Sequence, residues 1–203
     1  MKIKTLLLTL LTVCTLLFLS GCTSNKTNNN SDDNSDNGSD DSNWLENYTP
    51  VHTVGTGSDE FWIEFPAGSD SYGQSIEHFD WVINTIDNNC VLFVVHRTGC
   101  VGCKEQGDLV ISLAEKYNED VEFYDIDAVS GATAEIQQMS NEAYIYDPNG
   151  APGYIALTGV FTYIEDNGEI KIGWHSWELD VEDSVMESWI KDAIYYYNVN
   201  NKG

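Results

Sequence analysis

Six consecutive apolar residues, Cys90 to Val95, place the strongest limit on how this chain can fold. A run this short and this apolar is typical of a strand that is covered on both faces, as in sheets flanked by helices. The run is followed closely by Cys100-Val101-Gly102-Cys103, and the next apolar residues, Leu109, Leu113 and Tyr117, recur at helical spacing. The sequence therefore predicts a buried strand, a cysteine pair and a helix in immediate succession.

Further apolar patterns predict strands and helices that alternate along the chain. We expect strands at 61–65, 121–126, 160–164 and 169–174, and helices at 76–86, 132–140 and 185–197. Asn167-Gly168, between the last two strands, is typical of a type I′ hairpin turn. The order predicts an α/β fold, a mixed central sheet flanked by helices, with an irregular insertion at 141–157 before the final hairpin.

The composition excludes one large class of partners. The chain has 9 Lys and Arg against 33 Asp and Glu, a formal net charge of −24. Nucleic acids need clustered basic side chains to neutralise their phosphates, so we expect no nucleic-acid partner. An acidic surface of this kind indicates a well-solvated protein and is also compatible with a salty habitat.

The first residues have the pattern of an export signal rather than of a folded domain. Lys2 and Lys4 precede an apolar stretch, 6–19, that is shorter than the ~20 residues of a membrane span. The stretch ends in Leu19-Ser20-Gly21-Cys22, which resembles the lipobox of prokaryotic lipoproteins. That resemblance implies cleavage before Cys22 and lipidation of its thiol. An uncleaved amino-terminal anchor is the alternative.

Three regions follow from this pattern. Residues 1–21 are expected to be the signal peptide, and 22–43 a lipidated cysteine plus a flexible linker, because 23–43 contains no apolar side chain. Residues 44–203 are expected to form the folded domain, starting at Trp44. The predicted location is the outer face of the cell membrane, where disulfides can persist.

The order of elements, with a CxxC between a buried strand and a helix, resembles the thioredoxin superfamily. The strongest part of the resemblance is Val91 to Tyr117, and Val121 to Asp127 is similar to the strand that follows in that family. The resemblance implies a thioredoxin-like fold and thiol–disulfide exchange with cysteine pairs of other proteins. No organic cofactor is implied, because the cysteine pair carries the electrons.

The chain departs from the thioredoxin pattern at several positions. Gly99 stands where the family has tryptophan, and Val101-Gly102 replaces Gly-Pro. The family's buried acid aligns with Val94. Its cis-proline aligns with Val160 when residues are counted back from the hairpin turn, so we expect Val160 to face the CxxC after a trans peptide bond. Pro152 could supply the proline only if the preceding segment is rearranged.

The position of the CxxC has a physical rationale. Backbone N–H groups and the helix dipole at a helix start favour a thiolate, which lowers the pKa of Cys100 below the free value of ~8.5. His96, Arg97 and Lys104 add positive charge nearby. We therefore expect Cys100 to be the exposed attacking thiol and Cys103 the resolving thiol.

Other interpretations of the same residues stay open. Cys90, His96, Cys100 and Cys103 are of the right type for zinc or copper, but the second CxxC or His pair of a zinc ribbon is missing, so we assign no metal. Cys90 alone is expected to be a buried small hydrophobe, with a third redox thiol as the alternative. The remaining histidines are expected to be surface or packed residues: His52, His78 and His175.

The sequence supports three functional hypotheses. The first is a membrane-anchored, extracytoplasmic thiol–disulfide oxidoreductase that uses Cys100 and Cys103. The second is a non-catalytic binding lipoprotein on a thioredoxin-like scaffold, with a structural disulfide. The third is a metallochaperone-like protein that uses the CxxC with His96.

Overall fold

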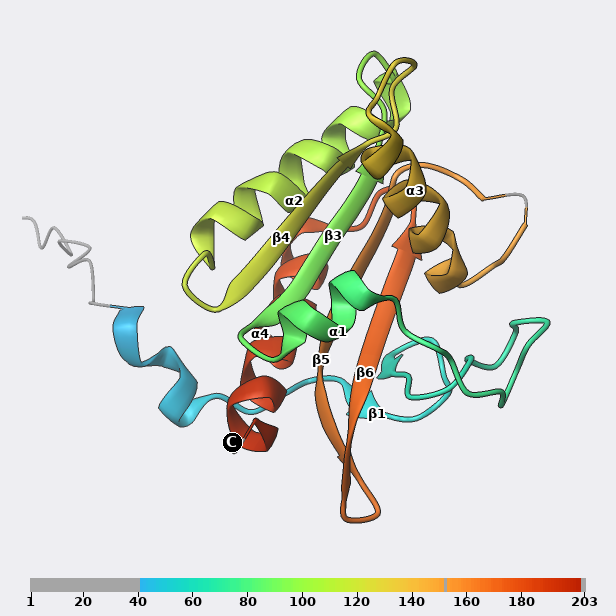
Figure 1. The fold of residues 1–203 in the computed structure, drawn as a ribbon. Coiled ribbons are helices and arrows are strands. Elements are labelled where there is room, and N and C mark those ends of the chain that lie inside the picture. The colour runs from blue at the N-terminus through green and yellow to red at the C-terminus, as the bar shows by residue number, and fades with distance from the viewer. Residues whose placement is uncertain (1–40, 152, 202–203) are drawn as a thin grey trace, which may run out of the picture. The chain divides into compact units, whose positions relative to one another are not determined.

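The computed structural model describes residues 41–151 and 153–201, and its centre is a four-stranded mixed sheet with the order β4-β3-β5-β6 (Figure 1). The strands of this sheet are β3 (Cys90–His96), β4 (Val121–Asp127), β5 (Leu157–Asp166) and β6 (Glu169–Glu178). Strands β3 and β4 are parallel, whereas β5 runs antiparallel to both β3 and β6. A separate parallel pair is formed by β1 (Thr53–Val54) and β2 (Glu60–Phe61).

Helices cover both faces of the central sheet, as the uniformly apolar β3 requires. The α-helices are α1 (Asp80–Ile86), α2 (Lys104–Lys116), α3 (Ala134–Ala143) and α4 (Asp183–Asn200). On one face Trp81 of α1 packs edge-on against Phe93 and Phe161. On the other face Thr162 donates a hydrogen bond to the Ala193 carbonyl of α4 at 2.6 Å. The predicted α/β class is confirmed.

The hairpin is the element that the sequence predicted most closely. Asn167 and Gly168 both have positive φ, 54° and 87°, as a type I′ turn requires. The arms are longer than expected, however, because β5 begins at Leu157 and β6 runs to Glu178. Ten-residue arms pair without interruption from Asp166–Glu169 back to Leu157–Glu178. The predicted insertion at 141–157 is shorter mainly at its start, because helices α3 and η3 (Tyr144–Tyr146) continue to Tyr146.

Two predicted elements before β3 are wrong in extent. Only Phe61 of the predicted strand 61–65 lies in a strand, and Trp62 makes a single bridge to Trp174 before the chain turns away from β6. The predicted helix 76–86 begins at Asp80. Its inward side chains are Val82 and Ile86, whereas Ile83 is 42% exposed, because a helix this short presents one i, i+4 pair to the sheet.

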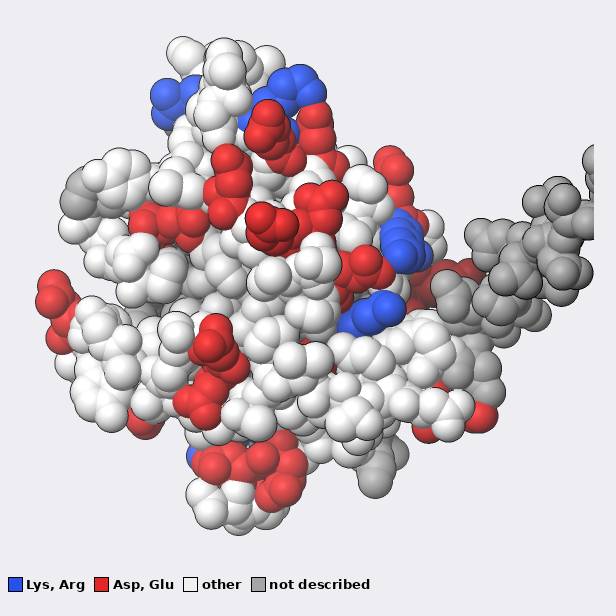
Figure 2. Space-filling model, turned by 180° about the vertical axis from the view of Figure 1, so that it is seen from behind, with Lys and Arg blue, Asp and Glu red and all other residues white. Residues whose placement is uncertain are grey.

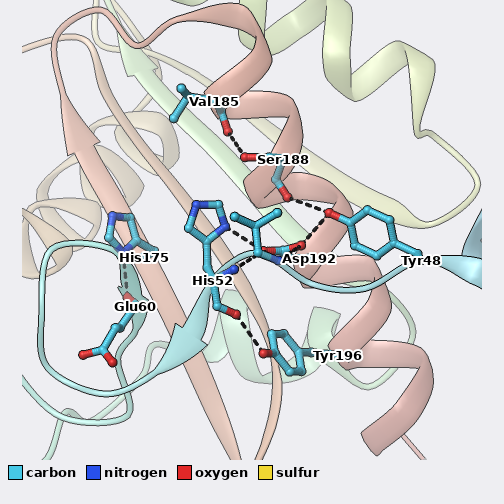
Figure 3. A network of polar contacts seen from close by, with 9 residues as sticks. Tyr48, His52, Glu60, His175, Val185, Ser188, Asp192 and Tyr196 are labelled. Atoms are coloured by element: carbon cyan, nitrogen blue, oxygen red, sulfur yellow. Dashed lines mark hydrogen bonds and ion pairs between the residues drawn. The ribbon is translucent and has the colours of Figure 1, made fainter.

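A buried carboxylate fastens the amino-terminal segment of the domain to α4 (Figure 3). Asp192 is fully buried and accepts a hydrogen bond from the Tyr48 hydroxyl at 2.5 Å. It also accepts from the backbone N–H of His52 at 2.7 Å, and its Oδ2 lies 2.6 Å from His52 Nδ1. A buried carboxylate is stable only when such donors surround it. These hydrogen bonds therefore hold the segment from Tyr48 to His52 against α4.

The predicted packing of the isolated histidines is confirmed. His52 and His175 both stack on Trp189, with ring centroids 3.5 Å and 3.8 Å from it. His78 stacks on Tyr146 at 5.8 Å. Among the residues that the structure describes, no group of three or more His, Cys, Asp or Glu side chains is placed to hold a metal ion.

The export signal, Cys22 and the linker lie outside the described residues, so their predicted roles stay predictions. Within 41–151 and 153–201, no helix combines the length and the apolar character that crossing a bilayer requires.

Candidate redox site

Cys100 and Cys103 are joined by a disulfide at the carboxyl end of β3. A short 3-10 helix, η2 (Val101–Cys103), follows Cys100 directly and runs into α2. The Cα atoms of the two cysteines are 5.4 Å apart, a separation that one helical turn provides. The predicted position of Cys100 at a helix start is therefore confirmed. The first backbone N–H groups of a helix have no intrahelical acceptor, which favours negative charge there.

The two cysteines differ in exposure. Cys103 is only 1% exposed and packs in the core, whereas Cys100 is half-buried. Val101, between them, is 90% exposed. Both cysteines line a surface hollow of about 300 Å³. A thiol of another protein can therefore approach the pair from the Cys100 side, as the sequence predicted.

The loop that carries Cys100 is held by the end of β4. The Asp127 carboxylate accepts hydrogen bonds from the Thr98 hydroxyl at 2.5 Å, from the Thr98 N–H at 2.9 Å and from the Val129 N–H at 3.1 Å. These donors, the Thr98 hydroxyl first, lower the pKa of Asp127. Gly99 adopts φ +87°, which lets the loop turn into Cys100.

The three predicted cations line the same hollow, and each has a partner. His96 Nε2 lies 2.5 Å from the Asp125 carboxylate, and the Arg97 Nε donates to the Ala128 carbonyl at 3.3 Å. Lys104 pairs with Asp108 one turn further along α2. Because His96 and Lys104 each face a carboxylate, the helix start and the Arg97 guanidinium are the local features that favour a thiolate at Cys100.

The strand order of the central sheet and the position of the disulfide together identify the fold type. A parallel β3–β4 pair continues through antiparallel β5 and β6, helices cover both faces, and the disulfide follows the central strand at a helix start. The fold is thioredoxin-like.

Two thioredoxin structures are similar to this chain. Oxidised thioredoxin O2 from Arabidopsis thaliana is 14% identical, with 51% of this chain and 74% of that chain covered and a TM-score of 0.33. The germline-specific thioredoxin Deadhead from Drosophila melanogaster is 16% identical, with 54% and 86% covered and a TM-score of 0.33. No family model and no curated protein matches the chain.

The position that aligns with the family's buried acid is apolar Val94, and a neutral polar pair, Gln106 and Thr158, lies beside it. Val94 is fully buried and pairs with Thr158 across β3 and β5. The buried Gln106 of α2 donates to the Thr158 hydroxyl at 3.3 Å and accepts from the Val181 N–H at 2.8 Å. Sequence reasoning missed Gln106, although its spacing to Val110 and Leu113 places it on the inward stripe of α2.

The predicted role of Val160 is wrong. Val160 lies in the middle of β5, fully buried, where it pairs with Leu92 on β3 and His175 on β6. The residue at the CxxC end of β5 is Leu157, which pairs with Val95. The peptide bond before Ala156, Ile155–Ala156, is cis. The error has a simple cause, since counting back from the turn assumed a strand that begins at Val160, three residues after the actual start of β5 at Leu157. Pro152 lies outside the described residues.

Cys90 lies at the opposite end of β3 from the CxxC. It is fully buried 4.0 Å from the Thr162 hydroxyl, and burial raises the pKa of its thiol far above the usual range. Cys90 and His96 stand six residue steps apart on β3, which is roughly 20 Å at ~3.3 Å per residue. The structure therefore does not bring Cys90, His96, Cys100 and Cys103 together as a metal-binding set, and Cys90 packs as a small hydrophobe.

Proposed function

We propose that this protein is a thiol–disulfide oxidoreductase whose active pair is Cys100 and Cys103. The observation that carries the proposal is the asymmetric disulfide, with one half-buried and one buried cysteine at a helix start. That asymmetry separates an attacking thiol from a resolving thiol, which a structural disulfide does not need.

The exchange would proceed in two balanced steps. In the reduced protein the Cys100 thiolate attacks one sulfur of a client disulfide, a new S–S bond forms, and the client's other sulfur leaves as a thiolate. Cys103 then loses its proton and attacks the Cys100 sulfur, which releases the second client thiolate. Two electrons pass to the client, two protons follow, and the Cys100–Cys103 disulfide remains. The reverse sequence oxidises a client dithiol.

The proposed site of work is the outer face of the cell membrane. Residues 1–21 have the pattern of an export signal, Cys22 stands at a lipobox cysteine, and 22–43 would tether the domain. Disulfides persist in that compartment, so the clients would be cysteine pairs of other exported proteins. The pair needs no organic cofactor for this chemistry.

The surface charge restricts which clients can dock. Figure 2 shows acidic side chains spread over one face of the molecule, with few basic ones among them. The whole chain carries 33 acids against 9 Lys and Arg. Neutral or basic client surfaces are therefore favoured over acidic ones, and nucleic acids are disfavoured.

A binding lipoprotein with a structural disulfide is the second candidate. It is favoured by the neutral Gln106–Thr158 pair near Val94, because no buried acid is present there to take the Cys103 proton. The carboxylate partners of His96 and Lys104, Asp125 and Asp108, also favour this candidate, because they offset positive charge near the cysteine pair. Both candidates predict the same fold and differ in the reactivity of the disulfide.

Trapping of mixed disulfides separates the two candidates. We expect Cys103→Ser to accumulate a Cys100-linked client in cells, since no resolving thiol remains, while the matched Cys100→Ser variant accumulates little or none. The reduction potential of the wild-type pair then gives the direction: values near about −270 mV indicate a reductase and values near about −120 mV an oxidant. A disulfide that resists strong dithiols, with no trapped client in either variant, would establish the structural role instead.

A further inference from the structure

Arg97 is a basic side chain beside the disulfide whose charge has no carboxylate partner. It lies in the loop between β3 and Cys100, and its side chain is exposed. Within residues 41–151 and 153–201, no ion pair involves Arg97, whereas every lysine has one: Lys104, Lys116, Lys171 and Lys191. In a chain with 33 Asp and Glu against 9 Lys and Arg, this unpaired cation requires an explanation.

The guanidinium of Arg97 is held in place but is not neutralised. Its Nε donates to the Ala128 carbonyl at 3.3 Å, and a carbonyl carries no net charge. The carboxylates at the end of β4 have other donors, since Asp125 contacts His96 and Asp127 accepts from the loop backbone. The two terminal NH₂ groups of Arg97 have no acceptor among the described residues. Such a planar fork can bind one carboxylate through two parallel hydrogen bonds.

Arg97 lines two hollows, and only one of them contains the cysteine pair. The other has a volume of about 440 Å³ and lies between the loop after β4, helix α3 and the side chains of Tyr144 and Ile155. None of its lining residues carries a carboxylate. Its polar groups are hydroxyls and amides, with Ser130, Ser140, Gln137 and Asn141 among them. The hollow can therefore accept a negatively charged group without repulsion from its own walls.

This acid-free hollow adjoins the place where a client disulfide would react. Ile155 stands two residues before Leu157, which is the CxxC end of β5. The charge of Arg97 also acts inside the hollow: burial, followed by the Asp147 charge, raises the pKa of Tyr144, and Arg97 opposes that rise. A client whose sulfur meets Cys100 can thus place a neighbouring group beside the guanidinium.

We propose that Arg97 binds a carboxylate that the client carries close to the sulfur attacked by Cys100. The inference rests on the proposed oxidoreductase function and makes Arg97 a specificity-determining residue for it. An acidic residue beside the cysteine of a protein and the carboxylate of a small thiol compound present the same group. Because the acidic surface as a whole disfavours acidic clients, the carboxylate should stand in an otherwise neutral or basic segment.

The first exchange step can be measured alone in full-length Cys103→Ser, which lacks the resolving thiol. The Cys100 thiolate attacks a peptide 2-pyridyl disulfide, a Cys100–peptide S–S bond forms, and the pyridyl sulfur leaves as a thiolate. Two blocked peptides differ only in Asp or Asn beside the cysteine. Mass spectrometry of the Cys100-linked product gives both rate constants, and rates with 2-mercaptoethanol correct for the intrinsic reactivity of each peptide.

The corrected Asp-to-Asn rate ratio is the decisive quantity. We expect a ratio of about fivefold with Arg97, the upper range for an exposed ion pair, and a ratio near one in Arg97→Gln. Arg97→Glu should instead prefer a peptide with Lys at that position. Any general effect of Arg97 on the Cys100 thiolate cancels, because both peptides meet the same thiol.

A matched control and a second pair of substrates complete the design. Lys171→Gln also removes one positive charge, but near the hairpin turn at the far end of β5 and β6, and should keep the ratio. The small pair is 3,3′-dithiodipropionate, which carries carboxylates, and neutral 2-hydroxyethyl disulfide. A preference limited to the peptides assigns a protein client, whereas a preference that extends to the small acid assigns a small thiol compound.

Two outcomes would overturn the inference, and they are distinguishable. If the ratio is the same with Arg97 and in Arg97→Gln while Cys100 stays reactive, no carboxylate is bound and the proposed function stands. If Cys100 reacts with both peptides no faster than 2-mercaptoethanol does, the oxidoreductase function fails and the inference falls with it.

Discussion

At the scale of single residues, His175 shows how burial changes the chemistry of an ionisable group. Its ring stacks on Trp189, and its Nδ1 lies 2.8 Å from the Glu60 carbonyl, so the ring donates there (Figure 3). Burial above all lowers the pKa of His175 to about 3. The neutral ring is therefore a structural requirement of the aromatic core at neutral pH.

The lowered pKa predicts acid sensitivity. The unfolded chain binds a proton on His175 below pH ~6.5, whereas the folded chain resists it until about 3, so stability is complete above that window and falls as pH drops through it. We expect His175→Asn to be less stable at pH 7, since stacking is lost, but to lose less stability between pH 6.5 and 4. Urea unfolding across this range measures both effects. An unchanged pH slope in the variant would show that His175 does not protonate on unfolding.

At the scale of elements, the link between the amino-terminal segment and α4 stands out. More than a hundred residues separate Tyr48 and His52 from Asp192 in the sequence, and no local sequence pattern predicts that they contact each other. The hydroxyl of Tyr196, on the same helix, also donates to the His52 carbonyl at 2.8 Å. Asp192 and Tyr196 of α4 thus hold the irregular segment from Tyr48 to His52 against the core.

Asp192→Ala tests this attachment. Removing the carboxylate leaves the Tyr48 hydroxyl and the backbone N–H groups of Val51 and His52 without their acceptor, so we expect a loss of about 3–5 kcal/mol. Amide hydrogen exchange should then accelerate at Val51 and His52 while β3 keeps its protection. Asp192→Asn is the matched control, because its remaining oxygen still accepts, and it should lose less. Unaltered exchange at His52 in the alanine variant would contradict the attachment.

At the scale of the whole molecule, the proposed lipid anchor determines where the thioredoxin-like domain works. We expect Cys22→Ala to abolish lipid labelling and to move the protein from the membrane fraction to the soluble fraction, because the cysteine thiol is the proposed attachment point. Cys14→Ala is the control, since it changes a cysteine inside the signal and should leave labelling intact. Continued lipid labelling of Cys22→Ala would refute the lipoprotein assignment.

The sequence by itself determined the features that depend on neighbouring residues. The apolar run Cys90–Val95 became the central strand, Asn167-Gly168 became the hairpin turn, and Cys100 came to lie at a helix start. Each of these follows from local periodicity, local turn chemistry or the spacing within a single motif. The same local patterns indicated the buried nature of Cys90.

Only the tertiary structure decided the features that depend on register and on distant contacts. The length of β5 placed Leu157 rather than Val160 at the CxxC end, because strand pairing continues as long as a partner strand is available. The Gln106–Thr158 contact joins α2 to β5, two segments that no local pattern connects. Burial and pairing set the chemistry of these groups, and both arise only when distant segments pack together.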